Sequence, residues 1–264
     1  MRRRLANVLR PRARGSRYSN LDEESVIRRL LDTLEIRRGW AVDIAAKDGV
    51  TMSNTLFLYE DGWRGLAVEG DPDSFAKLAR RYRTLDVDLA RLWLAPANVV
   101  ALLEAHGVPR EFELLNLDLD GYDRDVLEAI LRAFRPVVVC AEINEKIPPP
   151  VKFSVTYDPD YVWAEDHFYG QSLSALHELA TAQGYALVEL HYNSAFLLPA
   201  ERSPFTPQLP EEAYRSGYLE RPDRLRHFPW NVDMEPLHAL DTQAKIAFIR
   251  ERFRRYEGRY EIGA

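Results

Sequence analysis

Trp40–Asp71 reads WAVDIAAKDGVTMSNTLFLYEDGWRGLAVEGD and predicts a strand, a tight turn, a helix and a second strand. Residues 40–45 are a short apolar run rich in β-formers, and the turn after it carries Asp48-Gly49. Residues 65–69 form the second buried run, which ends at Glu69. In such a unit the amides of the turn and of the helix N-terminus face a nucleotide-type ligand, and an acid at the tip of the second strand accepts hydrogen bonds from a ribose diol.

The composition is that of a folded protein with an uneven charge. The chain has 264 residues, of which 46% are hydrophobic and 29% charged, enough for one sizeable domain with an appendage. Its net charge of −6 argues against a general nucleic-acid binder. Residues 1–19 hold seven arginines and no acid, which leaves about −13 on the rest by subtraction. We expect a solvated, disordered basic arm there; contact with a membrane surface or an acidic partner is the alternative.

Nothing in the sequence indicates secretion or membrane insertion. Cys140 is the one cysteine, so no internal disulfide can form. No run of about 18 apolar residues is present, which predicts no membrane-spanning helix. A cytoplasmic location is the resulting expectation.

Strands and helices alternate along the middle of the chain, which predicts an α/β fold with a mostly parallel sheet. The last two strands are joined by only a few residues, so they must be antiparallel. The predicted strands of this seven-stranded sheet are 40–45, 65–69, one within 83–97, 112–118, 136–142, 185–190 and 194–198.

Two segments fall outside the strand–helix alternation. Residues 145–169 are predicted to be irregular and are rich in aromatic residues, which is typical of a lid or substrate loop. Residues 201–264 form a C-terminal extension with a helix predicted over 242–256. The predicted organisation is therefore an arm at 1–19, a ligand-binding domain at 20–200 and an extension that packs on it.

Polar residues follow the fourth and fifth predicted strands. Asp118, Asp120 and Asp123 come after the fourth, and Glu142 and Asn144 after the fifth. Ligands of open α/β sheets bind at the carboxyl ends of the strands, and carboxylate and amide oxygens suit Mg²⁺ or Mn²⁺. The predicted metal ligands are Asp118, Glu142 and Asn144. The alternative is that these acids cap the turn and helix that follow, with Asp123 as an N-cap.

Five motifs in order resemble a little-characterised branch of the S-adenosylmethionine-dependent methyltransferases, close to the FkbM-like group. They are VDIAAKDGVTMSNT, GLAVEGD, FELLNLDLDGYD, PVVVCAEIN and GQSLSALHELATAQGY, within residues 38–198. The resemblance implies a Rossmann-like Class I fold, S-adenosylmethionine as cofactor, and O-methylation of sugars, glycans or polyketide-type metabolites.

The resemblance also implies residue roles. Asp43, Ala45 and Gly49 match the glycine-loop motif, Glu69 matches the ribose-binding acid, and Asp118 matches the acid after strand four. The Asp118 and Glu142/Asn144 arrangement is similar to metal-dependent O-methyltransferases. Lys47 departs from the family, because a glycine is usual at its position. The predicted cofactor-binding residues are Asp43, Ala45, Lys47, Gly49, Ser53, Asn54, Glu69 and Asp118.

The predicted catalytic residues are Asp118, Asp120 and His167. His167 lies in the aromatic segment and could serve as a general base, because an unperturbed histidine titrates near neutrality; a packing role is the alternative. His191 has the same two interpretations.

The sequence thus predicts an S-adenosylmethionine-dependent O-methyltransferase that acts on a hydroxyl of a sugar, glycan or natural product, with a divalent cation as an open question. Two other classes remain. A non-catalytic relative could keep the fold as an interaction module, and an NAD-dependent oxidoreductase shares the acid after strand two but lacks the GxGxxG motif here. A homodimer is left open.

Overall fold

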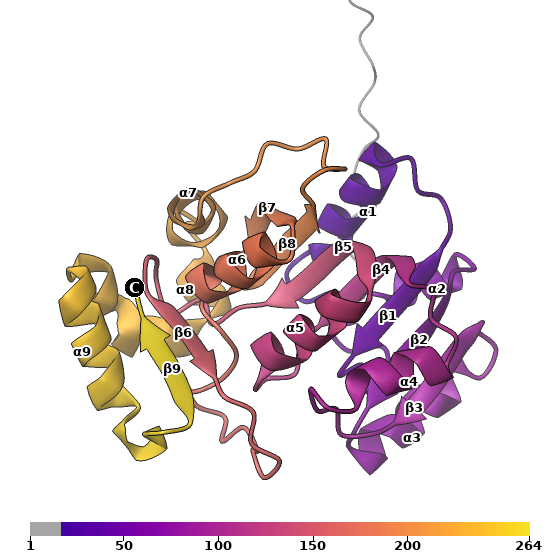
Figure 1. Cartoon of the computed structure of the whole chain (residues 1–264), viewed down its shortest axis with the longest axis horizontal. Coiled ribbons are helices and arrows are strands. Elements are labelled where there is room, and N and C mark those ends of the chain that lie inside the picture. The colour runs from indigo at the N-terminus through magenta and orange to yellow at the C-terminus, as the bar shows by residue number, and fades with distance from the viewer. Residues whose placement is uncertain (1–16) are drawn as a thin grey trace, which may run out of the picture.

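A seven-stranded sheet forms the centre of the protein in this computed structural model, which describes residues 17–264 (Figure 1). The strand order is β3-β2-β1-β4-β5-β8-β7. Residues 1–16 of the predicted basic arm lie outside the described residues. The strands are β1 (Trp40–Ile44), β2 (Arg64–Glu69), β3 (Val87–Arg91), β4 (Glu111–Leu117), β5 (Arg135–Glu142), β7 (Tyr185–His191) and β8 (Ser194–Pro199).

The strand directions confirm the predicted fold class. β1 to β5 pair in parallel, whereas β8 runs antiparallel to both β5 and β7. This is a Rossmann-like, mostly parallel sheet that ends in an antiparallel pair.

Helices cover both faces of the sheet, because side chains alternate along each strand. Val42 and Ile44 pack in one core with α4, α5 and α6, whereas Ala41 packs in a second core with α1, α2 and α3. Both cores are closed by apolar faces of these helices. The helices are α1 (Glu23–Thr33), α2 (Leu56–Glu60), α3 (Pro72–Tyr82), α4 (Val99–Ala105), α5 (Asp123–Ala133) and α6 (Leu173–Ala182).

The segment 145–169 is not irregular throughout, which corrects the sequence prediction. It contains β6 (Lys152–Val155), which pairs antiparallel with β9 (Tyr260–Gly263) in a second, two-stranded sheet. β6 is only four residues long, and its partner lies at the far end of the chain, so no local pattern marks it. Phe153 and Phe168 pack there against Phe253 in a third apolar core.

The extension after β8 consists of helical elements, most of them short, followed by β9, and it lies against the rest of the molecule. Phe228 joins the main core, and Met234 and Leu237 join the third core. The predicted helix over 242–256 ends earlier, at Arg252. The elements are α7 (Pro210–Tyr214), a π-helical turn η1 (Arg215–Leu219), α8 (Arg224–His227), a 3₁₀ stretch η2 (Pro229–Ala239), α9 (Thr242–Arg252) and a 3₁₀ turn η3 (Arg254–Tyr256).

None of the helices among residues 17–264 is long and apolar enough to cross a membrane.

Candidate functional site

The turn after β1 has a backbone shape that normally requires glycine. Ala45, Lys47 and Gly49 all have positive φ angles, of 64°, 50° and 75°. Left-handed backbone is unfavourable for residues with a Cβ. A Cβ on Gly49 would lie 2.6 Å from both Leu78 and Tyr82, so only glycine fits at this third position. The loop therefore has the conformation of a three-glycine loop, although two of its glycines are replaced.

Glu69 holds this loop at the end of β2. Its Oε2 accepts a hydrogen bond from the Lys47 amide at 2.8 Å, and its Oε1 accepts one from the Asp71 amide at 2.7 Å. Each carboxylate oxygen has two acceptor positions, so both oxygens keep capacity for a further donor. The ribose contact of Glu69 stays a prediction.

Asp43 has a structural role in the described contacts. Its Oδ2 accepts from Thr55 Oγ1 at 2.6 Å and its Oδ1 from Asn116 Nδ2 at 2.8 Å, which ties β1 to the start of α2 and to β4. Burial raises the pKa of Asp43 to about 6. Ser53 Oγ likewise accepts from the Leu56 amide at the first turn of α2. Both residues hold the start of α2 in place.

Asn54 combines an anchored nitrogen with a free oxygen. Its Nδ2 donates to Asn116 Oδ1 at 3.1 Å, while its buried Oδ1 has no partner in the protein. A buried acceptor without a donor is unfavourable, and a ligand is one explanation for it. The predicted cofactor contact by Asn54 is consistent with this geometry.

Three acids converge at the carboxyl ends of β4 and β5. Oxygens of Asp118, Asp120 and Glu142 all lie within 4.8 Å of one another, the group of this kind found among residues 17–264. The register pairs Leu117 with Ala141, which brings the next residue of each strand to the same edge. We call Asp118, Asp120 and Glu142 the acid cluster.

The acid cluster is too crowded to be fully ionised without a compensating charge. Burial, then repulsion by Asp120, raises the pKa of Asp118 to about 7, although the Asp118 residue keeps solvent-exposed surface. Burial and the neighbouring acids raise the pKa of Glu142 well above its usual value. Glu142 Oε1 accepts from Asn193 Nδ2 at 2.7 Å, but its buried Oε2 has no donor. A proton or a cation can supply the missing positive charge.

Lys47 lies in the loop after β1, and its charge acts on the acid cluster. Its charge lowers the pKa of both Asp118 and Asp120, which opposes the effect of their burial. The side chain of the residue that departs from the glycine motif therefore acts on the neighbouring acids.

Asn144 lies two residues after β5. Its Nδ2 donates to the carbonyl oxygens of His167 and Tyr169, at 2.8 and 2.9 Å. Its Oδ1 is buried without a partner. The metal contact predicted for Asn144 stays a prediction, and Asp120 joins Asp118 and Glu142 in the acid cluster. Asp123 accepts from the amides of Leu119 and Gly121, so it organises the turn before α5. The N-cap role predicted for it as the alternative is wrong, because Asp123 is the first residue of α5 and Tyr122 is the N-cap.

His167 faces an acid that the sequence does not single out. Its Nε2 lies 3.0 Å from Asp233 Oδ1 in the C-terminal extension, and its Nδ1 is buried without a partner. Burial lowers the pKa of His167, against the opposing effect of Asp233. The other candidate, His191, is occupied: Arg221 contacts its Nδ1 and the Leu21 carbonyl its Nε2.

A buried charged pair directly follows β5 and was also missed. Glu145 and Lys146 are 0% and 2% exposed, and Lys146 Nζ lies 3.2 Å from Glu145 Oε1. Lys146 donates to Tyr169 Oη at 2.6 Å, and that hydroxyl donates to Glu145 Oε2 at 2.9 Å. The signal was present in the sequence, since two charged residues immediately after a buried strand need partners.

Trp93 is a second missed residue. It is 71% exposed, and its ring lies against Gly70, where a Cβ would come within 2.4 Å of it. Gly70 directly follows Glu69, so an exposed aromatic ring lies beside that acid.

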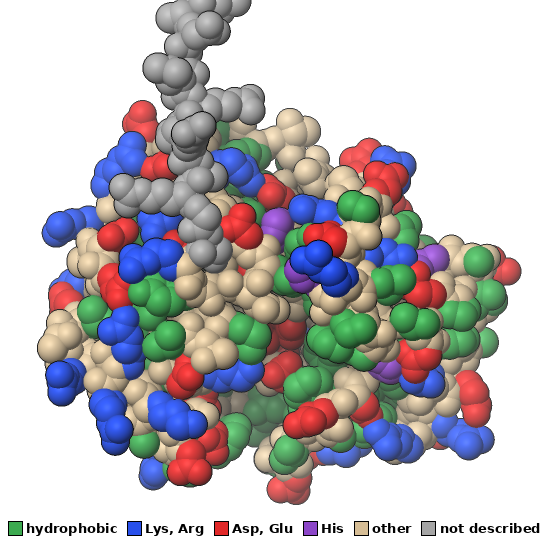
Figure 2. Space-filling view, turned by 180° about the vertical axis from the view of Figure 1, so that it is seen from behind, with side chains coloured by type: hydrophobic (Ala, Val, Ile, Leu, Met, Phe, Trp, Pro, Cys, Tyr) green, Lys and Arg blue, Asp and Glu red, His purple; other side chains and the backbone are tan. Residues whose placement is uncertain are grey.

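The face in Figure 2 has a hollow near its centre, with acidic and hydrophobic side chains around it. In Figure 1 the carboxyl ends of β1 and β5 point toward β6, β9 and α9.

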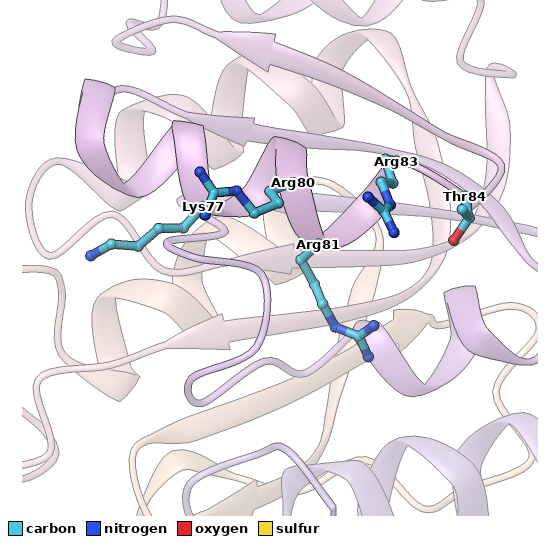
Figure 3. A pocket seen from close by; sticks show the side chains of 5 residues that line it. All are labelled: Lys77, Arg80, Arg81, Arg83 and Thr84. Atoms are coloured by element: carbon cyan, nitrogen blue, oxygen red, sulfur yellow. The ribbon is translucent and has the colours of Figure 1, made fainter.

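A separate surface hollow of about 480 Å³ lies at the end of α3 and is lined mostly by basic residues. Its side chains diverge in Figure 3, and Arg81 is paired with Glu60, so it forms no focused ligand site. The lining residues are Lys77, Arg80, Arg81, Arg83 and Thr84.

Comparison with known proteins gives structural likeness only. No family model matches the chain, and no curated protein is similar to it in sequence. Similar solved structures include an S-adenosylmethionine-dependent methyltransferase from Clostridium acetobutylicum ATCC 824 (11% identity, TM-score 0.43, 68% of this chain and 92% of that chain). Another is a putative O-methyltransferase from Klebsiella pneumoniae (14%, 0.44, 67% and 79%). A third is magnesium protoporphyrin IX methyltransferase from Synechocystis PCC 6803 with bound SAM (9%, 0.41, 66% and 76%). At these identities and scores the likeness assigns no residue role to this chain.

Proposed function

We propose that this protein is an S-adenosylmethionine-dependent O-methyltransferase that acts on a hydroxyl group of a sugar, glycan or natural product. The observation that carries the proposal is the joint geometry of the loop after β1 and Glu69. In this loop every second residue, Ala45, Lys47 and Gly49, has a left-handed backbone. Glu69, whose oxygens can each accept a further hydrogen bond, lies beside the loop at the carboxyl edge of the parallel sheet. Ligands of open α/β sheets bind at this edge.

The residues at this edge fit the proposed cofactor. Glu69 would accept the ribose hydroxyls, and the unpartnered Oδ1 of Asn54 would accept a donor from the ligand. Trp93 would cover a face of the adenine ring, since aromatic rings favour offset stacking. When bound, S-adenosylmethionine supplies an electrophilic methyl group. The chain contributes the orientation of the acceptor, because an in-line displacement depends strongly on positioning.

The acid cluster would hold a divalent cation through Asp118, Asp120 and Glu142. Carboxylates suit Mg²⁺ or Mn²⁺, and the cluster has unsatisfied negative charge. A cation there would lower the pKa of an acceptor hydroxyl. The acceptor itself would lie between this cluster and the aromatic residues of segment 145–169.

Calorimetry with S-adenosylhomocysteine on cofactor-stripped protein tests the proposal. We expect S-adenosylhomocysteine to bind the wild type, and to bind Glu69→Gln at least tenfold more weakly. The reason is that a neutral amide oxygen accepts hydrogen bonds from the ribose hydroxyls less strongly than a carboxylate does. Glu104→Gln, on the exposed surface of α4, is the matched control. Absence of binding to the wild type would overturn the proposal, and NADH binding instead would favour an oxidoreductase.

Tryptophan fluorescence tests the proposed adenine contact. Adding S-adenosylhomocysteine should quench the wild-type emission, and Trp93→Phe should lose most of that change. Trp230→Phe removes another exposed tryptophan, 58% exposed, in the extension, and should leave the change intact. Equal quenching in wild type and Trp93→Phe would remove Trp93 from the site.

The cation proposal has its own test. Mg²⁺ or Mn²⁺ should raise the unfolding temperature of the wild type, because a ligand that binds only the folded state stabilises it. The shift should be lost in Asp118→Asn and kept in Asp73→Asn, an exposed aspartate on α3. A shift that survives in Asp118→Asn would contradict a site at the acid cluster.

A further inference from the structure

We propose that Asp233, a residue of the C-terminal extension, is a positioning residue that holds the imidazole of His167 with Nδ1 free to take the proton of the acceptor hydroxyl. The inference rests on the proposed methyl transfer. It gives residues 201–264 a part in the reaction beyond packing.

The Asp233 carboxylate is fixed by one partner on each oxygen. Oδ1 lies 3.0 Å from His167 Nε2, and Oδ2 accepts a hydrogen bond from Arg252 of α9. Because the two partners come from different segments, the carboxylate cannot turn without losing one of them. A carboxylate only accepts hydrogen bonds, so a neutral imidazole in this contact carries its proton on Nε2.

The other ring nitrogen is then an acceptor that the protein leaves unused. His167 Nδ1 is buried, and no protein donor reaches it. A buried acceptor without a donor is unfavourable. A hydroxyl group of a bound acceptor would satisfy it, which is the contact that a general base makes with its substrate.

Hydrogen bonds tie the backbone around His167 to the segments that carry the acid cluster. The His167 carbonyl accepts from Asn144, directly after β5. Tyr161 Oη bridges the carbonyl oxygens of Asp120 and Phe168, so the chain next to His167 is tied to the acid cluster. The charge of Lys146 also acts on both Asp120 and His167.

Three charged groups act on the imidazole. Asp233 favours its protonation, whereas Lys146 and Arg252 oppose it, and burial is the largest effect and lowers the pKa of His167. The lowered pKa favours the neutral ring, which is the form that a general base needs. Protonation during the reaction would be stabilised by the adjacent Asp233 carboxylate.

The step balances with the proposed cofactor alone. The acceptor oxygen forms a bond to the methyl carbon, and the bond between that carbon and the sulfonium sulfur breaks with its electron pair going to sulfur. The hydroxyl proton passes to His167 Nδ1 and later to solvent.

Nitrogen NMR of the histidine rings tests the inference on the full-length protein at pH 8, without substrate. Two-bond proton–nitrogen correlations distinguish the tautomers, and His167→Gln assigns the signal. The wild type should show a protonated Nε2 and an unprotonated Nδ1. In Asp233→Asn, Arg252 should retain the amide oxygen, which turns the amide nitrogen toward His167. That nitrogen donates, so the tautomer should reverse.

Asp223→Asn is the matched control, because Asp223 contacts a different histidine, His227, at 3.2 Å. It should leave the His167 signal unchanged. Protonation of His167 on Nδ1 in the wild type would overturn the inference. So would an unchanged His167 tautomer in Asp233→Asn, provided that this variant has the circular dichroism spectrum of the wild type. Calorimetry with S-adenosylhomocysteine reports separately on the proposed function, since neither variant touches Glu69 or its loop.

Discussion

At the scale of single residues, the loop after β1 stores backbone strain at Ala45 and Lys47. Left-handed φ angles of 64° and 50° place each Cβ close to the following carbonyl group. Such strain persists where surrounding contacts hold the conformation, and it concentrates at functional sites. Here the contacts are known: Ala46 donates to the Val68 carbonyl, and Lys47 donates to Glu69.

Ala45→Gly should therefore stabilise the protein by about 1 kcal/mol, because glycine adopts this conformation without a Cβ penalty. Ala46→Gly is the matched control. Ala46 has no positive φ, so the substitution should destabilise by about 0.5–1 kcal/mol through the entropy of the unfolded chain. Urea unfolding followed by circular dichroism measures both. A loss of stability in Ala45→Gly would mean that the loop is not strained at this residue.

The acid cluster should make stability depend on pH. The pKa of Asp118 is about 7 in the folded protein and near 3.8 when unperturbed. A raised folded pKa contributes stability that is complete below the unfolded pKa and is lost as pH rises through the folded pKa. The free energy of unfolding should thus fall from about pH 4 to about pH 7 without divalent cations. Since Asp118 is partly solvated, we expect about 1 kcal/mol from this residue rather than the full shift.

Asp118→Asn removes this titrating group, so the free energy of unfolding of the variant should fall less than that of the wild type over the same pH range. Asp86→Asn, an exposed aspartate paired with Arg64, should follow the wild type. Thermal unfolding at several pH values, with a chelator present, gives the comparison. Parallel curves for wild type and Asp118→Asn would show that Asp118 is not perturbed in the folded protein.

At the scale of secondary structure, the central sheet was predictable and the small one was not. The apolar run 136–142 and the alternation of strands with helices identify β5 and the parallel sheet locally. The antiparallel direction of β8 follows from the short connection after β7. In contrast, β6 is defined by pairing with β9, about a hundred residues later, and such a distant partner leaves no local pattern in a four-residue strand.

Phe253 is the element-scale test of how the small sheet is held. It is 2% exposed and contacts Phe153, Phe168 and Tyr260. Phe253→Ala should destabilise by about 3–5 kcal/mol, the usual cost of removing a buried aromatic ring. The affinity for S-adenosylhomocysteine should not change in the folded fraction, because the proposed cofactor contacts lie on β1, β2 and their loops.

The matched control for this substitution is Phe248→Ala, since Phe248 lies on α9 but is only partly buried. Phe248→Ala should lower the free energy of unfolding clearly less than Phe253→Ala does. Equal losses from the two substitutions, measured by chemical unfolding, would argue against Phe253 as the centre of the third core.

At the scale of the whole molecule, the sequence located the candidate residues at strand ends and missed the contacts between distant segments. Asp118, Glu142 and Glu69 each lie at the carboxyl end of a strand, so the strand prediction alone places them. Asp120 lies in the turn after β4, and strand periodicity does not determine where a turn places its side chain. Asp233 meets His167 only through the path of the extension, and no spacing in the sequence encodes that contact.

The same long-range assembly surrounds Glu145, where three parts of the chain meet. Its Oε1 accepts from Asn231 Nδ2 at 2.6 Å, and its carbonyl accepts from Tyr214 Oη at 2.5 Å, both from the extension. Its Oε2 accepts from Tyr169 of the aromatic segment. Together with Lys146, this buried carboxylate joins the end of β5, the aromatic segment and the extension.

Lys146→Met should cost about 3–5 kcal/mol, because it leaves the Glu145 charge buried without its cation. Combining it with Glu145→Gln should cost less than the sum of the two single substitutions, since the amide is neutral and still accepts from Tyr169. A double-mutant cycle by urea unfolding measures this coupling. For comparison, the exposed pair Arg132–Glu128 on α5 should give at most about 1 kcal/mol. Additive effects at Glu145 and Lys146 would show that the pair does not act as a unit, and the extension would then be held by its apolar contacts alone.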